Sequence, residues 1–361
     1  MDTDNTLLVT AQPEFIGEAV AELKRIDTQL TNTEEITPGI MLCLIPGVSK
    51  FMQRAARKDL TFARHIAPVQ AIISLNNTER DMGKIATTIA QLPTFGLLER
   101  GIHFSVQSRF VQTENSQGQK PFSTGQLNRT LAEAFAEESG SIESINKPQV
   151  VISILCTMTS AYLGISAAEE NLSSWPGGAR HYAHTDDQIS RAEFKLLEAL
   201  EVFGVSLPSE GRALDLGSAP GGWTRLLLEA GSQVISVDPA KLDNRLMGYS
   251  RLKHYRGYAE NYLDEAIKKR ITFDIIVNDM RMDARDAARL LVEAAACLTG
   301  NGFVISVLKL PHMTPDFDPL AVLNNALHIL RERYGVVQAR QLFHNRQEVT
   351  IFAAHPQRKR S

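Results

Sequence analysis

The 361-residue chain is 43% hydrophobic and 7% aromatic, and its 38 Lys and Arg residues nearly balance its 41 Asp and Glu residues. This apolar content excludes a disordered or fibrous protein, and the sequence lacks the run of about 18 apolar residues that a membrane span needs. The net charge of -3 gives no overall attraction to nucleic acid or to an anionic membrane, so any polyanion has to be held by local patches. The length predicts two or three domains.

The start of the chain and its three cysteines indicate a cytoplasmic protein. Asp2 and Asp4 stand where a secretion signal carries basic residues, and no small-residue cleavage site follows. Cys43, Cys156 and Cys297 lie in apolar runs without C-x-x-C or Cys/His ligand spacing. We therefore expect reduced core cysteines and no metal site.

Residues 1–75 predict a small ferredoxin-like α/β module. Short strands are expected at 6–10, 39–45 and 71–75, and apolar residues at helical spacing predict a helix over 14–26. Residues 50–64 are rich in Lys and Arg. Such a run is typical of a solvated helix face, and an RNA-facing patch is the alternative.

Residues 76–168 predict a second small module. Helices are expected over 79–92 and from Ser123, which forms a capping box with Gln126, to about residue 139. Strands are expected over 102–111, 149–158 and 160–167. Counted from Ala71, the order β-α-β-α-β-β indicates a small α/β layer rather than part of a Rossmann unit.

The remaining sequence predicts a linker over 169–187 and a doubly wound α/β domain over 188–361. The linker is polar and irregular, whereas the domain alternates helices and strands. Such alternation makes a mostly parallel sheet that binds its ligands at the carboxyl ends of the strands. The expected helices cover 190–203, 223–230, 283–298 and 319–334, and the expected strands cover 212–216, 233–237, 273–278, 302–308 and 347–354.

The most specific motif lies between the first strand and the next helix of this domain. Residues 215–223 read Asp-Leu-Gly-Ser-Ala-Pro-Gly-Gly-Trp, and Asp238 follows Gly217 by 21 residues. Glycines let a ligand approach the backbone, and a carboxylate at this distance suits ribose hydroxyls, so the pattern predicts a nucleoside-cofactor site. Asp215 favours the cationic S-adenosylmethionine over a dinucleotide. A purely structural glycine turn is the alternative.

This loop resembles that of the FtsJ-type S-adenosylmethionine-dependent RNA ribose methyltransferases. The resemblance implies a catalytic Lys-Asp-Lys-Glu tetrad, which matches Lys195, Asp279, Lys309 and Glu348 in order. It also implies a set of cofactor contacts. These are Asp215, Gly217, Ser218, Ala219, Pro220, Gly221, Gly222, Trp223, Asp238 and Asp279.

The resemblance extends to the RlmM group, whose members methylate ribose in large-subunit ribosomal RNA. Residues 60–64, 308–311 and 338–344 are similar to segments of that group, and the middle module looks like a THUMP RNA-binding domain. The implied substrate is 23S ribosomal RNA, before or during subunit assembly. The oligomeric state stays undetermined.

The tetrad suits methylation of a ribose 2'-hydroxyl, whose proton must leave as the oxygen attacks. Lys309 is the candidate general base, and it needs a neutral amine, which burial and a neighbouring ammonium favour. Asp279 is expected to orient Lys309, while Lys195 and Glu348 position the hydroxyl. No metal is required.

Candidate RNA contacts are basic residues outside the tetrad. They are Arg54, Arg57, Lys58, Arg64, Arg109, Arg129, Arg180, Arg191 and the tail Arg358-Lys359-Arg360.

Three other functions stay open from the sequence. A transfer-RNA methyltransferase is the nearest alternative, because THUMP-like modules also serve such enzymes. A noncatalytic RNA-binding assembly factor and a nicotinamide-dependent dehydrogenase are the others. The usual motifs of base methylation, an Asn-Pro-Pro-Tyr or a catalytic cysteine, do not occur, and the intact tetrad argues against a noncatalytic protein.

Overall fold

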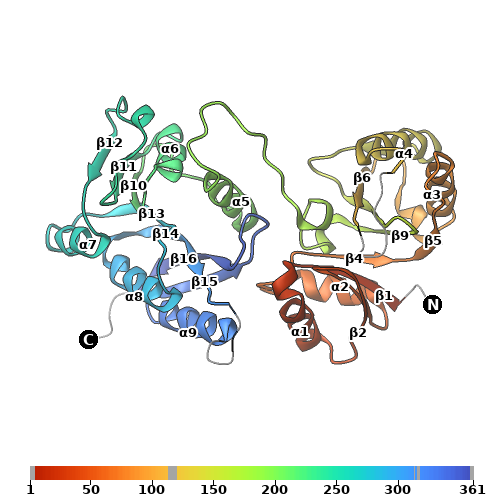
Figure 1. Cartoon of the computed structure of the whole chain (residues 1–361), viewed down its shortest axis with the longest axis horizontal. Helices are drawn as coiled ribbons and strands as arrows, with labels where there is room; N and C mark the ends of the chain where they lie inside the picture. Colours follow the sequence, from red (N-terminus) through yellow and green to blue (C-terminus); the bar gives the residue numbers. More distant parts are fainter. Residues whose placement is uncertain (1–4, 113–119, 313, 315–317, 358–361) are drawn as a thin grey trace. The chain divides into compact units, whose positions relative to one another are not determined.

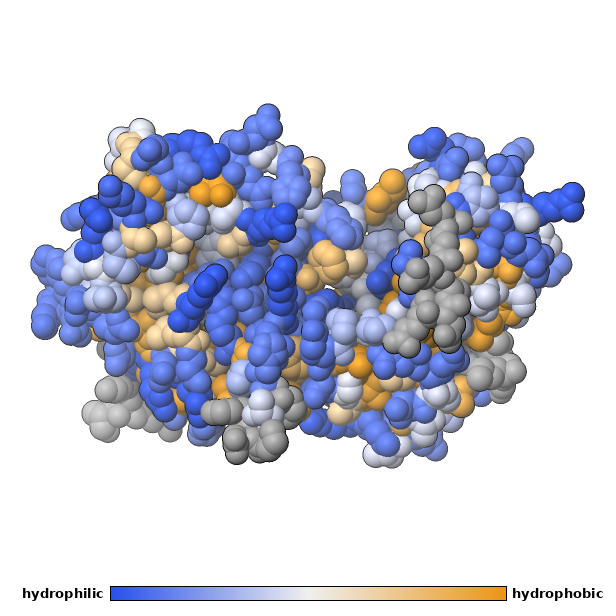
Figure 2. All heavy atoms as spheres, in the orientation of Figure 1, coloured by the Kyte–Doolittle hydropathy of each residue, from blue (hydrophilic) through white to orange (hydrophobic). Residues whose placement is uncertain are grey.

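The structure is a computed structural model that describes residues 5–112, 120–312, 314 and 318–357 (Figure 1). The chain forms two compact units, unit 1 from Met1 to Arg180 and unit 2 from His181 to Ser361. The division between them falls inside the predicted linker. Hydrophilic residues cover most of the face of each unit that Figure 2 shows, and hydrophobic residues are exposed only in small patches.

Unit 1 begins with a four-stranded antiparallel sheet and two helices. The elements are β1 (Thr6–Thr10), α1 (Ile16–Ile26), β2 (Thr31–Thr37), β3 (Ile40–Leu44), α2 (Val48–Ala56) and β4 (His65–Val69). The strands lie in the order β2-β3-β1-β4. Most of β2 is exposed, so its sequence lacks the alternation that predicts a strand. On α2, Phe51 and Met52 are buried while Lys50 and Arg54 are exposed, as a solvated basic helix face requires.

A second, five-stranded sheet with two helices completes unit 1. The elements are β5 (Ala71–Ser74), α3 (Arg80–Ala90), β6 (His103–Phe110), α4 (Thr124–Ser139), β7 (Ile142–Glu143), β8 (Val150–Cys156) and β9 (Ser160–Ala167). The order is β5-β9-β8-β6-β7, so the strand expected to end the first module pairs with β9. The predicted capping box is present, because Ser123 Oγ accepts from Gln126 N and Gln126 Oε1 accepts from Ser123 N.

The two sheets of unit 1 share an apolar contact. Leu8, Leu42 and Ala67 from the first sheet belong to one buried cluster with Leu155 from the second. Gly164 in β9 permits a close approach, since a Cβ atom there would lie 1.9 Å from the carbonyl oxygen of Pro68. The two predicted modules thus pack as one compact body.

Unit 2 contains a seven-stranded sheet with helices on both faces. Its elements are α5 (Glu193–Phe203), β10 (Arg212–Leu216), α6 (Gly222–Glu229), β11 (Gln233–Val237), β12 (Leu252–Tyr255), α7 (Ala259–Lys268), β13 (Phe273–Asn278), α8 (Ala284–Ala294), β14 (Leu298–Lys309), α9 (Pro319–Arg331), β15 (Tyr334–Arg340) and β16 (Glu348–Pro356). Helices α5 and α6 pack together, while α7, α8 and α9 pack in succession on the other face (Figure 1).

The strand order β12-β11-β10-β13-β14-β16-β15 confirms the predicted doubly wound sheet. Only β16 among the described strands of this sheet runs against its neighbours, β14 and β15. The order reverses between β10 and β13, which is where sheets of this kind bind their ligands. Three elements were not predicted, β12, α7 and β15, and Tyr334 begins β15 rather than ending the preceding helix.

The three cysteines are buried free thiols, as predicted. Among the described helices, none is both long enough and apolar enough to cross a membrane.

Candidate active site

The four residues of the predicted tetrad meet at the carboxyl edge of the sheet in unit 2. Asp279 directly follows β13, and Lys309 is the last residue of β14. Glu348 is the first residue of β16 and lies opposite Lys309 in the antiparallel register. Lys195 comes from the first turn of α5. Three strand ends and one helix that are far apart in sequence therefore bring their charged side chains together.

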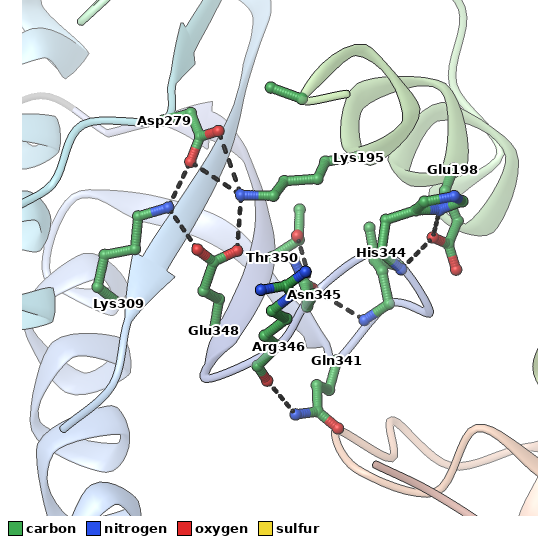
Figure 3. A network of polar contacts seen from close by, with 12 residues as sticks. Lys195, Glu198, Asp279, Lys309, Gln341, His344, Asn345, Arg346, Glu348 and Thr350 are labelled. Atoms are coloured by element: carbon green, nitrogen blue, oxygen red, sulfur yellow. Dashed lines mark hydrogen bonds and ion pairs between the residues drawn. The ribbon is translucent and has the colours of Figure 1, made fainter. Parts of the chain in front are cut away.

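The tetrad side chains form a closed ring in which positive and negative charges alternate (Figure 3). Lys309 Nζ lies 2.6 Å from Asp279 Oδ1 and 2.7 Å from Glu348 Oε1. Lys195 Nζ lies 2.7 Å from Glu348 Oε2 and 3.3 Å from Asp279 Oδ2. The four side chains are between 15% and 22% exposed, so the ring is shielded but still open to a substrate.

The ring controls the ionisation of Lys309 and Glu348. Burial alone would lower the pKa of Lys309, but pairing with Asp279 and Glu348 outweighs it, and the pKa lies above its usual value. For Glu348, burial is outweighed by Lys195 and Lys309, which hold its pKa below the usual range. Burial thus acts in the expected direction, but in the protein on its own the two carboxylates favour the protonated form of Lys309.

The glycine loop joins β10 to α6 next to this ring. Gly217 has φ of 70°, and a Cβ atom there would lie 2.2 Å from Met280 Cγ. Gly221 has φ of 114°, and a Cβ atom there would lie 2.3 Å from Leu246 Cδ1. Both positions need glycine for backbone conformation and for space. The bond between Ala219 and Pro220 is cis.

Asp238 and Asp215 make hydrogen bonds to the loop and to the helix that follows it. Asp238 Oδ2 accepts from Ala219 N at 3.0 Å, and its Oδ1 accepts from Ala240 N at 2.7 Å. Asp215 is buried, and its Oδ2 accepts from Thr224 Oγ1 at 2.6 Å. Burial raises the pKa of Asp215 to about 7. This carboxyl group is thus only partly ionised near neutral pH.

Three other predicted cofactor residues make contacts within the protein. Ser218 Oγ lies 2.6 Å from Ser236 Oγ, and Trp223 Nε1 donates to Ala192 O at 2.6 Å. A Cβ atom at Gly222 would lie 2.4 Å from Ser190 Oγ. The contact of Ser218 joins the loop to β11. The contacts of Trp223 and Gly222 pack α6 against the start of α5, so they join the glycine loop to the helix that carries Lys195.

The predicted RNA contacts of unit 1 fall into different environments. Arg109 is half-buried, and its buried Nη1 atom has no hydrogen-bond partner within the described residues. A Cβ atom at Gly177 would lie 1.7 Å from that Nη1, so Arg109 packs beneath this turn. Half-buried Arg64 packs against Gly178 in the same way. Arg109 is therefore less accessible to RNA than the exposed cations of unit 1.

Most of the other basic candidates are exposed. Arg54 pairs with Asp27 at 2.6 Å, and the half-buried Arg180 lies over the ring of Trp175 at 3.8 Å. Like Arg54, the other exposed candidates are Arg57, Lys58 and Arg129 in unit 1 and Arg191 in unit 2. The tail Arg358-Lys359-Arg360 lies outside the described residues.

The sequence did not mark Glu198, which joins the helix of Lys195 to His344 in the segment 338–344. Glu198 lies on α5, three residues after Lys195, and it is buried. Its carboxylate accepts hydrogen bonds from the backbone N–H of Phe343, the backbone N–H of His344 and the Nδ1 atom of His344. A glutamate on an amphipathic helix is normally exposed, so no sequence signal distinguishes this one.

Tyr258 lies between β12 and α7, directly before α7, and is 66% exposed. Among the described residues, no group of three or more His, Cys, Asp or Glu side chains is placed to hold a metal ion.

Known proteins resemble the chain in the same region. Residues 188–335 match the family model described as FtsJ-like methyltransferase. The ribosomal RNA large subunit methyltransferase M of Pseudoalteromonas translucida (strain TAC 125) is 31% identical over 57% of this chain and 57% of its own length. The first such matches therefore span less than two thirds of the relatives. The protein of the same name from Shewanella halifaxensis (strain HAW-EB4) is 28% identical over 89% of this chain and 88% of its own length.

Solved structures are also similar to the chain, at low sequence identity. TrmN from Thermus thermophilus covers 97% of this chain and 99% of its own, with a TM-score of 0.41 and 18% sequence identity. A fibrillarin pre-rRNA processing protein from Methanococcus jannaschii covers 60% of this chain and 85% of its own, with a TM-score of 0.38 and 14% identity.

Proposed function

We propose that this chain, whose residues 188–335 match the FtsJ-like methyltransferase family model, transfers a methyl group from S-adenosylmethionine to a ribose 2'-hydroxyl of large-subunit ribosomal RNA. The observation that carries the proposal is the alternating ring of Lys195, Asp279, Lys309 and Glu348 beside the glycine loop. The names of the relatives support ribosomal RNA as the substrate.

The methyl donor would be held by the glycine loop and the aspartates around it. S-adenosylmethionine supplies a methyl group on a positively charged sulfur. Asp238 organises the loop and lies at the end of β11, where a carboxylate suits ribose hydroxyls. Asp279 adds negative charge on the side of the sheet where a cation would bind, and the partly ionised Asp215 adds less.

Lys309 would accept the proton of the ribose hydroxyl. In the protein alone, Asp279 and Glu348 favour its protonated form, because each carboxylate stabilises the ammonium. A positive donor beside the ring opposes this effect, and so does the ammonium of Lys195. The role of Asp279 is then to orient Lys309, while Lys195 and Glu348 hold the hydroxyl in line with the methyl group.

Unit 1 would capture the RNA. Its exposed cations, Arg57, Lys58 and Arg129, can contact phosphates, and the module over 76–168 is the part that we compare with a THUMP domain. The small net charge predicts weak binding to unrelated RNA, so recognition would depend on the shape of one target.

The proposal is tested by incubating the purified protein with methyl-labelled S-adenosylmethionine and unmodified RNA. We expect label in a 2'-O-methylated nucleoside after digestion of large-subunit ribosomal RNA, and little label in transfer RNA. Preferential labelling of transfer RNA would overturn the assigned substrate. Label in a base would overturn the mechanism, and donor binding without turnover on any RNA would favour a noncatalytic assembly factor.

A further inference from the structure

We infer that Glu198 is a positioning residue that sets Lys195 within the tetrad. The inference rests on the proposed function, because it assigns a role in the same reaction. Its basis is a set of hydrogen bonds that tie α5 to the segment preceding β16, close to the ring of charges (Figure 3).

Glu198 makes three hydrogen bonds from a buried position. Its Oε1 accepts from Phe343 N at 2.7 Å, and its Oε2 accepts from His344 N at 3.0 Å and from His344 Nδ1 at 2.7 Å. The side chain is only 5% exposed. A buried carboxylate is costly unless it is well bonded, and these three donors supply that bonding.

The same two segments also make the contact between Lys195 and Glu348. Lys195 lies one helical turn before Glu198, and Glu348 follows His344 by four residues. Two bridges therefore join α5 to this part of the chain, one through Glu198 and His344 and the other between Lys195 Nζ and Glu348 Oε2 at 2.7 Å. The first bridge fixes the geometry of the second.

The strand pairing explains why such a tie is needed. The antiparallel register places Glu348 opposite Lys309, so the sheet itself positions these two residues. Lys195 comes from a helix, and side-chain contacts have to set its distance from the sheet. Asn345 stabilises the segment before β16 that contains Phe343 and His344, because its Oδ1 accepts from Leu342 N and from Thr350 Oγ1.

Ring packing supports the same link. The centroid of the His344 ring lies 5.3 Å from that of Phe194 and 5.5 Å from that of Tyr182. Phe194 immediately precedes Lys195 in α5. The bond from Nδ1 to Glu198 orients the His344 ring against this cluster.

Glu198→Gln tests the inference with little change of size. An amide keeps one acceptor oxygen, but its NH₂ group cannot accept a hydrogen bond. At least one of the three buried donors then loses its partner, and the two segments shift apart. The hydrogen bond from Trp223 Nε1 to Ala192 O holds the start of α5 against the glycine loop without Glu198, so binding of the methyl donor is expected to change little.

The first measurement is steady-state methylation of RNA. We expect kcat to fall by about 10- to 100-fold in Glu198→Gln, as for a small displacement of a reacting group, with KM for S-adenosylmethionine within about twofold of the unchanged protein. The matched control is Glu201→Gln on the same helix, where an exposed carboxylate accepts from Tyr182 Oη. This control is expected to keep kcat.

The second measurement needs no RNA. The lysine side-chain ammonium signals are recorded by ¹⁵N NMR, and the Lys195 signal is assigned with Lys195→Arg. In Glu198→Gln this signal should shift or broaden, while it should be unchanged in Glu201→Gln. An unaltered Lys195 signal in Glu198→Gln would overturn the inference, whatever the activity.

The two measurements separate this inference from the proposed function. An active protein with equal kcat in Glu198→Gln contradicts the positioning role alone. A protein that methylates no RNA contradicts the proposed function, and the NMR signal then still decides whether Glu198 positions Lys195.

Discussion

Lys309 and Glu348 lie opposite each other in the antiparallel pair β14–β16, and Lys309 Nζ is 2.7 Å from Glu348 Oε1. An antiparallel strand begins at the edge where its parallel neighbours end. Glu348, as the first residue of β16, therefore reaches the same edge as Asp279 and Lys309. Reversal of one strand brings the fourth charge into the site.

Lys195→Met should shift the pH dependence of methyl transfer to higher pH. The substitution leaves two carboxylates around a single ammonium, so the pKa of Lys309 rises further and less of the neutral base is present near neutral pH. We expect the rate near neutral pH to fall by up to about tenfold. Part of this loss should be recovered as the pH rises. The measurement is kcat as a function of pH.

The control for this experiment is Lys268→Met, which removes an exposed lysine from α7. It should keep the pH profile of the unchanged protein. An unshifted profile in Lys195→Met would show that Lys195 does not influence the base.

Asp215 should make unfolding depend on pH. Burial raises its pKa to about 7 in the folded protein, above the ordinary value of 3.8, so the folded state binds this proton more tightly than the unfolded state. The contribution of Asp215 to the free energy of unfolding is therefore complete below about pH 4 and is lost as the pH rises through about 7.

Asp215→Asn removes this titration. The difference in free energy of unfolding between the unchanged protein and the variant, measured by chemical denaturation at several pH values, should vary between pH 4 and 7 and level off above. Asp264→Asn, at an exposed site on α7, is the control and should give a constant difference. If the free energies of unfolding of Asp215→Asn and of the unchanged protein differed by a constant amount at every pH, the raised pKa of Asp215 would be contradicted.

Gly221→Ala should destabilise unit 2 and weaken binding of the methyl donor. The residue has φ of 114°, and the added Cβ would lie 2.3 Å from Leu246 Cδ1. Strain of this kind costs about 1–3 kcal/mol of unfolding free energy. Chemical denaturation and calorimetric titration with S-adenosylmethionine measure the two effects. Gly248→Ala is the control, because a Cβ there meets nothing within 4 Å, and it should change stability and binding little. Equal effects of the two substitutions would contradict the predicted clash at Gly221.

Arg57 and Arg109 should contribute differently to RNA binding. Arg57 is exposed, so Arg57→Ala is expected to lower the slope of log K against log salt by about one if the residue contacts a phosphate. Arg109 packs beneath Gly177, so Arg109→Met should leave the slope unchanged. Filter binding over a salt series measures both, and a reduced slope in Arg109→Met would place that residue back at the RNA surface.

The sequence was informative where function depends on strand ends. Alternating helices and strands imply a parallel sheet whose carboxyl ends share one edge, so Asp279 and Lys309 could be expected beside the glycine loop. The resemblance to the FtsJ family, which the family match confirms over residues 188–335, supplied Lys195 and Glu348 as expected tetrad members. Their mutual distances and the raised pKa of Lys309 could not be predicted, because they depend on the packing of α5 and β16.

Residues whose environment is set by distant segments were harder to predict. Arg109 looked like a surface cation because the pattern of its strand does not reveal that the turn at Gly177 covers it. Glu198 looked like an ordinary helix glutamate because its three partners are about 145 residues later in the chain. The exposed strand β2 lacked the alternation on which strand prediction depends.

The central claim is that Lys309 takes the proton of a ribose 2'-hydroxyl during methyl transfer. The most direct test is single-turnover methylation of unmodified large-subunit ribosomal RNA by the unchanged protein and by Lys309→Met, with the label located by nucleoside digestion. We predict label in a 2'-O-methylated nucleoside and a rate about 10²- to 10⁴-fold lower in the variant, which should still bind S-adenosylmethionine. Label in a base, or an undiminished rate in Lys309→Met, would contradict the account.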